Sequence, residues 1–226
     1  MCGRFTIITD PVKMMERFIL DEIAFHLEPR YNVAPGQMIP AIIADKGKRR
    51  IGKLKWGLVP SWASDEKIGY KMINARAETL TEKPAFRNLF ARKRCMIPAD
   101  SFYEWRQTQK GKQPMRIMMK SEGLFAFAGL YDTWTRPDGQ KLHTCTIITT
   151  RPNEVVRDIH DRMPVILRGP EDEAIWLDRD TFDAELLQSL LVPYDAEQMR
   201  AYPVSAMVGS PKNDVPECIE EISDPA

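Results

Sequence analysis

The sequence predicts an α+β fold whose β core is mainly antiparallel. Short β-prone runs separated by Gly, Pro and Asp fill the middle of the chain, and segments with helical spacing do not alternate regularly with them. Regular alternation would indicate a doubly wound parallel sheet. The 226 residues are 43% hydrophobic and contain no repeat or Pro/Ser-rich linker. The chain can therefore close one substantial core, and we predict a single domain over residues 1–226.

Local patterns predict the individual elements. Asp10 followed by Pro11 is typical of a helix start, because a carboxylate caps the first turn and Pro fits the first helical position. Further helical patterns are found at 84–92, 153–158, 170–177 and 181–191. A turn-rich segment covers 31–36. The β-prone runs, which we expect to pair as strands, are 38–44, 50–56, 115–120, 124–131 and 142–150.

The sequence shows no sign of a membrane segment, a secretion signal or a metal centre. Its apolar stretches are far shorter than the about 18 to 20 residues that a spanning helix needs, and the first ten residues lack the regions of a signal peptide. We therefore expect a cytoplasmic protein with reduced cysteines. The cysteines lack metal-ligand spacing, which predicts neither a structural metal nor a disulfide framework; they are Cys2, Cys95, Cys145 and Cys218.

The formal net charge is zero, but the charges are unevenly distributed along the chain. Residues 1–120 carry a net charge of +11 and residues 121–226 a net charge of −11. Such a division can mark a surface that faces a polyanion. Alternatively, the two segments interleave in space and neutralise each other.

Cys2 is the residue with the most chemical content. It follows the initiator Met, and a residue this small normally permits removal of that Met, which leaves an α-amine beside the thiol. The α-amine has a pKa of about 7.7 to 8.0, so part of it is neutral and nucleophilic near pH 7. An aldehyde captured by this amine as an imine would then be attacked by the thiol, which closes a thiazolidine ring. Alternatively, the amine activates the thiol as in N-terminal-nucleophile hydrolases, or Cys2 is a chance residue in a frayed terminus.

Three further segments contain groups suited to acid/base chemistry or anion binding. INARAE at 73–78 places the Asn74 amide two residues before a cation, and FYEW at 102–105 places Glu104 within aromatic residues. IHDRMP at 159–164 contains His160 next to Asp161. Each segment alone also fits a structural role, such as a strand carboxylate facing water or a satisfied histidine.

In chain order, six segments together resemble the SRAP family, SOS-response associated proteins that shield abasic sites in DNA. They are MCGRF, YNVAPG, the W-G-x-x-P-x-W stretch at 56–62, INARAE, FYEW and IHDRMP, and the resemblance extends to PVS at 203–205. It implies a single α+β domain with a curved, barrel-like, mainly antiparallel β core, short flanking helices and a groove for single-stranded DNA. It also implies a stable thiazolidine between the N-terminal Cys and the ring-opened sugar of an abasic site.

The resemblance assigns four residues to the chemistry. Cys2 is the nucleophile, Asn74 and His160 adjoin the adduct, and Glu104 is the acid/base group. The residue types suit these roles, because ring opening, dehydration and ring closure each move a proton. We expect burial among aromatic residues to raise the pKa of Glu104 towards neutrality, and His160, with an ordinary pKa near 6.5, can protonate the sugar oxygen.

The resemblance and the residue types together place seven residues along the DNA: the arginines, the proline and the threonine match family positions, and the tryptophans are assigned because they can stack on bases. Arginines suit phosphates through their forked donors, and tryptophans stack on bases of any sequence. For the arginines, the alternative is an intraprotein ion pair. Trp56 could also stack on bases, but a place in the core fits it equally well. The seven are Arg4, Pro35, Trp62, Arg76, Trp105, Thr149 and Arg162.

Three functions remain open on the sequence alone. They are covalent capture of abasic single-stranded DNA with a secondary lyase activity, a cysteine peptidase acting on its own first residue, and a non-covalent module for single-stranded DNA. We expect a monomer without cofactor or metal, whose partner is single-stranded DNA containing an abasic site. The acidic segment from about residue 217 is predicted to be a solvated tail.

Overall fold

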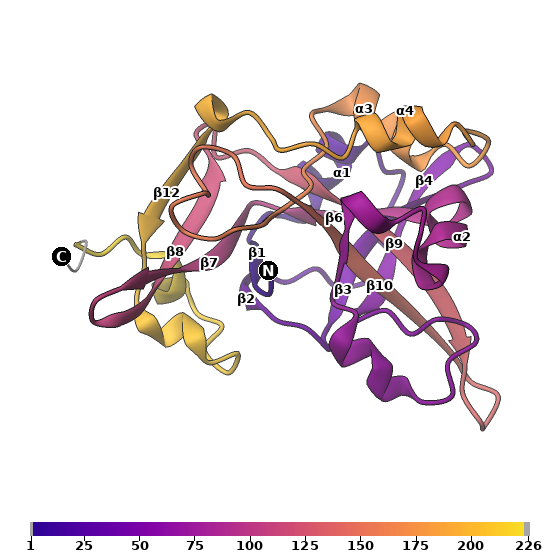
Figure 1. Ribbon diagram of the computed structural model, residues 1–226, viewed down its shortest axis with the longest axis horizontal. Helices are drawn as coiled ribbons and strands as arrows, with labels where there is room; N and C mark the ends of the chain where they lie inside the picture. Colours follow the sequence, from indigo (N-terminus) through magenta and orange to yellow (C-terminus); the bar gives the residue numbers. More distant parts are fainter. Residues whose placement is uncertain (1, 224–226) are drawn as a thin grey trace.

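The computed structural model describes residues 2–223, whose strands form two sheets. The smaller sheet has the order β12-β8-β7-β1-β2, and each pair of neighbouring strands is antiparallel. In Figure 1 it forms the left part of the molecule, beside the N-terminus. Its strands are β1 (Phe5–Ile7), β2 (Arg30–Val33), β7 (Ser101–Thr108), β8 (Gly111–Met119) and β12 (Met199–Pro203).

The larger sheet closes on itself. Strands pair in the order β10-β4-β3-β6-β9, and β9 pairs again with β10, so these strands form a barrel within the described residues. Only the β10–β4 step of this ring is parallel. The strands are β3 (Met38–Asp45), β4 (Lys48–Trp56), β6 (Arg94–Ala99), β9 (Phe125–Thr135) and β10 (Lys141–Thr150). The predicted α+β class with a barrel-like, mainly antiparallel core is therefore confirmed.

Two short strands extend the barrel towards the site described below. β5 (Asn74–Arg76) lies parallel to β10, with Ile147 opposite Asn74. β11 (Met163–Pro164) pairs antiparallel with the end of β10. The C-terminal half of β10 thus has neighbours from two segments that resemble family motifs.

The helices are short and lie on the outside of the sheets (Figure 1). The first begins as expected, because the Asp10 side chain accepts a hydrogen bond from the Lys13 N–H (3.0 Å) and Pro11 occupies the first position. The helices are α1 (Pro11–Phe18), α2 (Pro84–Arg92), α3 (Pro170–Leu177) and α4 (Ala184–Ser189). Single 3-10 turns are η1 (Glu66–Lys71), η2 (Ala77–Thr79), η3 (Ala196–Gln198), η4 (Ala206–Gly209) and η5 (Pro216–Ile219).

Two expectations about the chain were wrong. Residues 153–158 lie in hydrogen-bonded turns instead of a helix: the carbonyls of Asn153 and Val156 each accept from the two N–H groups three and four residues later, and no helical ladder joins the two turns among the described residues. The segment from 217 is not simply a solvated tail. Cys218 is fully buried and its carbonyl accepts a hydrogen bond from the Tyr103 hydroxyl, so a few apolar side chains dock this acidic segment on β7. Residues 224–226 lie outside the described part.

The hydrophobic core joins the two sheets. The ring of Phe5 on β1 packs against Trp56 and Phe127 of the barrel at centroid distances of 5.3 and 5.7 Å, and Phe102 on β7 packs against Phe127 at 6.1 Å. Full burial of an aromatic side chain of this kind contributes about 1.5 to 3 kcal/mol. The N-terminal strand is thereby fixed between the sheets.

Two further predictions concern cysteines and membranes. All four cysteines are free and buried. None of the helices within residues 2–223 is both long and apolar enough to cross a membrane.

Candidate functional site

Cys2 and Glu104 are brought together by the pairing of β1 with β7. Phe5 lies opposite Phe102, and the Tyr103 N–H donates to the Arg4 carbonyl at 3.0 Å, so the residues preceding β1 run beside Glu104. Both side chains lie inside the protein, since Cys2 is 0% and Glu104 2% exposed.

Burial sets the protonation state of both groups. It raises the pKa of Glu104 to about 7, so this carboxyl can accept or donate a proton near neutral pH. Burial, and then the nearby charge of Glu104, raise the pKa of the Cys2 thiol. The thiol is therefore neutral at pH 7, and its reaction requires a base. The expected shift at Glu104 is confirmed, with desolvation as its main cause.

His160 reaches the same carboxyl from the loop between β10 and β11. Its Nε2 lies 3.9 Å from Oε2 of Glu104. Nδ1 lies 3.0 Å from the Arg162 N–H and 3.3 Å from the Arg162 carbonyl oxygen, so it can accept from the first or donate to the second; when it accepts, the proton of the neutral ring is on Nε2, facing Glu104. Burial lowers the pKa of His160 and favours this neutral form. Oδ1 of Asp161 lies 3.0 Å from Nδ1 and can bind the ring whenever Nδ1 carries a proton.

Asn74 lies on β5, which is tied to the N-terminal strand through Trp56. The Trp56 indole donates to the carbonyl of Ile73 at 2.9 Å, and its ring packs on Phe5. The Asn74 Nδ2 makes one long contact to Ile147 O (3.4 Å). Its Oδ1 is buried and has no hydrogen-bond partner among residues 2–223. Because buried polar atoms are almost always paired, this oxygen is a candidate ligand contact.

Arg162 is held inside the protein by a partner that the sequence analysis missed. Its guanidinium binds both carboxylate oxygens of Glu78 at 2.8 and 2.9 Å, and Nη2 also donates to the Thr149 carbonyl at 2.6 Å. The Arg162 side chain is only 12% exposed, whereas that of Glu78 is 51% exposed. Glu78 belongs to INARAE, but a carboxylate four residues after Asn74 has no sequence signal that names its partner. The alternative of an intraprotein ion pair thus describes Arg162 in this state.

Arg4 and Trp105 also contact each other. The Arg4 guanidinium lies 5.9 Å from the centroid of the Trp105 ring, and it donates to Asn32 Oδ1 (3.0 Å) and to the Gly209 carbonyl (3.0 Å). Arg4 therefore ties β1 to β2 and to the segment after β12. A role for either residue in DNA contact stays a prediction.

Of the other predicted DNA contacts, Thr149 is fully buried, whereas three lie at the surface or close to it. Trp62 is 65% exposed, Arg76 is exposed with no ion pair in the described part of the chain, and Pro35 is half-buried. The loop that carries Trp62 is anchored at Gly57, where φ is +130° and an added Cβ would lie 2.8 Å from the Gly69 carbonyl oxygen, so a side chain is excluded. Trp56, by contrast, is fully buried in the core.

The four residues predicted to carry the chemistry thus lie on elements that converge. Glu104 adjoins Cys2 and His160, and Asn74 is linked to β1 by the Trp56 and Phe5 contacts. No group of three or more His, Cys, Asp or Glu side chains within residues 2–223 is arranged to hold a metal ion.

Comparison with known proteins gives a consistent result. The family model described as SOS response associated peptidase (SRAP) matches residues 1–211. The abasic site processing protein YoqW of Bacillus subtilis is 59% identical over 223 residues, which are 97% of this chain and 99% of YoqW. The abasic site processing protein HMCES of Xenopus tropicalis is 34% identical, over 86% of this chain and 67% of HMCES.

Solved structures agree on the fold. A crystal structure of a protein from Bacteroides thetaiotaomicron superposes with a TM-score of 0.87 at 30% identity, covering 98% of this chain and 100% of that one. A second, from Bordetella bronchiseptica, gives 0.76 at 28% identity over 90% of this chain and 100% of that one. With the family model covering nearly the whole chain and relatives above 50% identity, this protein belongs to the SOS response associated peptidase (SRAP) family.

Proposed function

We propose that this protein, after removal of Met1, captures abasic sites in single-stranded DNA covalently as a thiazolidine on Cys2. Family membership and the names of the relatives support the lesion as substrate. One observation carries the chemistry: a buried carboxyl with a pKa of about 7, Glu104, adjoins Cys2 and lies 3.9 Å from His160. This arrangement supplies a proton donor and acceptor where the new bonds form.

The reaction we propose has three steps. As the sugar ring opens to the aldehyde, the Glu104 carboxylate takes the proton of the anomeric hydroxyl and the protonated form of His160 gives its Nε2 proton to the ring oxygen. The Cys2 α-amine then adds to the aldehyde carbon, and one amine proton moves to the new hydroxyl of the carbinolamine. Glu104 then protonates the carbinolamine hydroxyl, which leaves as water and forms the imine. Finally Glu104, now a carboxylate, takes the thiol proton as the sulfur attacks the carbon of the imine, which is still protonated on nitrogen, so that the nitrogen becomes the neutral ring amine. One water is lost overall. The dipole of the Asn74 side chain orients the sugar hydroxyls.

We propose that exposed groups around this site hold the DNA. The Arg76 guanidinium makes no hydrogen bond or ion pair within residues 2–223, and Arg76 lies on β5, the strand that contains Asn74. Trp62 presents a largely exposed ring for base stacking. Contacts of this kind act on backbone and bases in single strands without requiring a particular sequence.

Two secondary activities follow from the same groups. An imine on a deoxyribose invites β-elimination, so we propose a lyase activity that closure of the ring by the thiol suppresses. The family description also contains the word peptidase. We propose that any such activity is limited to the protein's own first residue, with the Cys2 thiol as nucleophile and Glu104 as its base.

The decisive experiment measures the intact mass of the Met-processed protein after incubation with a single-stranded oligonucleotide that contains one abasic site. We expect a heat-stable adduct with the mass of protein plus DNA minus one water. The undamaged oligonucleotide and a Met-retaining protein serve as controls and should give none.

The matched variant is Cys2→Ala, which keeps the α-amine and removes the thiol. It should lose the stable adduct completely and cleave the abasic strand faster than the wild type. Undiminished stable adduct in this variant would remove the thiazolidine from the mechanism. No adduct in the wild type would sink covalent capture for this chain.

A further inference from the structure

A cavity lies at the opposite end of the barrel strands from Cys2. Its volume is about 600 Å³, and it is enclosed by the β3–β4 hairpin, the end of α2 and the segment that follows α3. We call it the hairpin pocket; its lining residues used below are Lys46, Arg92, Leu177, Arg179 and Phe182. β4 starts at this pocket with Lys48 and ends at Trp56 near the candidate site, about 26 Å away at the rise of a strand. A ligand here cannot touch the reacting groups.

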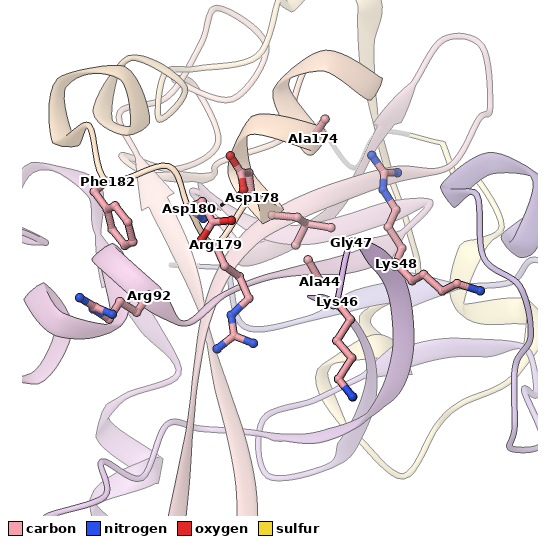
Figure 2. Close-up of a pocket in the computed structure, with 12 residues that line it drawn as sticks. Ala44, Lys46, Gly47, Lys48, Arg92, Ala174, Asp178, Arg179, Asp180 and Phe182 are labelled. Carbon is pink, nitrogen blue, oxygen red and sulfur yellow. Dashed lines mark hydrogen bonds between the residues drawn. The ribbon is translucent and has the colours of Figure 1, made fainter.

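The pocket has an excess of cations. Five basic residues line it against two acidic ones, Asp178 and Asp180. Asp178 is already bound by its own loop, since it accepts hydrogen bonds from the Asp180 N–H (3.0 Å) and the Thr181 hydroxyl (2.6 Å). Figure 2 shows the charged ends of Arg92, Arg179 and Lys46 in a row below the two carboxylates in that view.

Three of these cations pair with no carboxylate in the part of the chain that the structure describes. Within residues 2–223 no hydrogen bond or ion pair engages the side chains of Lys46, Arg92 or Arg179. The other two are occupied: Lys48 pairs with Asp21 (3.0 Å) and Arg49 with the buried Glu173 (3.1 Å). Part of the excess positive charge of residues 1–120, that of Lys46 and Arg92, therefore lies at this pocket without an ion pair in the described residues.

An apolar surface adjoins the three cations. Leu177 is buried in the floor, and the Phe182 ring is 54% exposed. The Arg92 guanidinium lies 5.2 Å from the centroid of this ring, which leaves further ring surface open to a planar partner. The hairpin is rigid at its tip, because Lys46 and Gly47 both adopt positive φ (50° and 75°) in a tight turn. The volume lies within the range of small-molecule sites.

We propose that the hairpin pocket binds a nucleotide, with the base against Phe182 and the phosphate between Arg92, Arg179 and Lys46. Forked guanidinium groups match phosphate oxygens, and an exposed aromatic ring stacks on any base. The nucleotide is either free in solution or part of a DNA strand. The proposal does not depend on capture chemistry, because the pocket is separate from Cys2.

The test uses the full chain with Cys2→Ala, so that no covalent adduct forms. Isothermal titration calorimetry measures binding of deoxyadenosine monophosphate, and fluorescence anisotropy measures binding of an undamaged 20-nucleotide strand. The double variant Arg92→Ser/Arg179→Ser removes the phosphate contacts and Phe182→Ala removes the ring. Arg157→Ser, an exposed arginine paired with Glu154 elsewhere on the surface, is the matched control.

We expect the double variant to weaken mononucleotide binding at least tenfold and Phe182→Ala about five- to a hundredfold, with the control unchanged. If the pocket holds a nucleotide of a strand, the 20-mer also loses about tenfold, and the salt dependence of its affinity falls by about 0.7 in log–log slope, as expected for one phosphate contact. If it holds a free nucleotide, the 20-mer is unaffected. No mononucleotide binding by the parent protein, or equal loss in Arg157→Ser, would overturn the proposal. Circular dichroism confirms that each variant folds.

Discussion

The candidate site and the hairpin pocket hold their charged groups in opposite ways. At the candidate site Glu104 and Arg162 are 2% and 12% exposed, and Arg162 is bound by Glu78 and Thr149. At the hairpin pocket Arg92 and Arg179 are exposed and have no protein anion among the described residues. Burial shifts proton affinity, which suits chemistry, whereas exposure leaves charge available for a ligand. We therefore propose that the buried groups of the candidate site react, whereas the exposed cations of the hairpin pocket bind a ligand.

The largest expected effect tests whether burial makes Glu104 the acid/base group. Glu104→Gln should slow adduct formation about 10²- to 10⁴-fold, because the amide neither gives nor takes the proton. The wild-type rate should change with pH around the Glu104 pKa of about 7. Single-turnover adduct formation, followed on denaturing gels from pH 5 to 9, measures both.

Glu104→Asp is the matched control for this experiment. It keeps a titrating carboxyl in a shorter side chain, so a pH-dependent rate should persist at a reduced level. If Glu104→Gln keeps both the wild-type rate and its pH dependence, another group moves the protons.

A second effect concerns stability. The pKa of Glu104 is about 7 in the folded protein against an ordinary value of 4.5, so folding favours its protonated form. The cost of burying the charge appears as pH rises from about 4.5 to 7 and is complete above 7, where it reaches about 3 kcal/mol. Glu104→Gln should therefore stabilise the protein by up to about that amount at pH 8 and change little at pH 4.5.

Thermal or urea denaturation at the two pH values measures this difference. Glu82→Gln, at an exposed position of the same residue type, should leave stability nearly unchanged at both. A destabilised Glu104→Gln at pH 8 would contradict the assigned cost of burial and point to hydrogen bonds that the carboxylate alone can accept.

The smallest expected effect comes from removing the carboxylate of Glu78, which would leave Arg162 without an ion pair, like the cations of the hairpin pocket. Arg162 is the main cause of the lowered pKa of Glu78, so the pair is ionised at neutral pH. Since the pair is half open to solvent on the Glu78 side, it is worth less than about 1 kcal/mol. Glu78→Gln should free the guanidinium for a phosphate and raise affinity for undamaged single strands by up to about fivefold.

Fluorescence anisotropy in the Cys2→Ala background, at several salt concentrations, measures this change. The salt dependence should steepen by about 0.7 in log–log slope, as expected for one additional phosphate contact. A loss of affinity would instead show that Glu78 positions Arg162 for DNA.

Local patterns predicted most of the elements. The helices at 84–92 and 170–177 begin at Pro residues and end where the patterns end, because capping and periodicity act within a few residues. The helix predicted at 153–158 does not form. The Asn153 side chain accepts from the local Val156 N–H and also donates to the carbonyl of Tyr194, which is distant in the chain and which no local pattern indicates. Closure of the barrel by β9 with β10 required long-range pairing, which no local pattern encodes.

By itself the sequence determined the residue types of the site: a thiol at position 2, a carboxyl at 104, an imidazole at 160 and an amide at 74. The tertiary structure decided how they act. The β1–β7 pairing buries Cys2 and Glu104 together, and the loop after β10 brings His160 to the same carboxyl. The tertiary structure also pairs Arg162 with Glu78 and leaves Arg92 and Arg179 without an ion pair among residues 2–223. The reason is physical: proton affinity and pairing depend on burial and on neighbours far apart in the chain, and only the packed fold creates them.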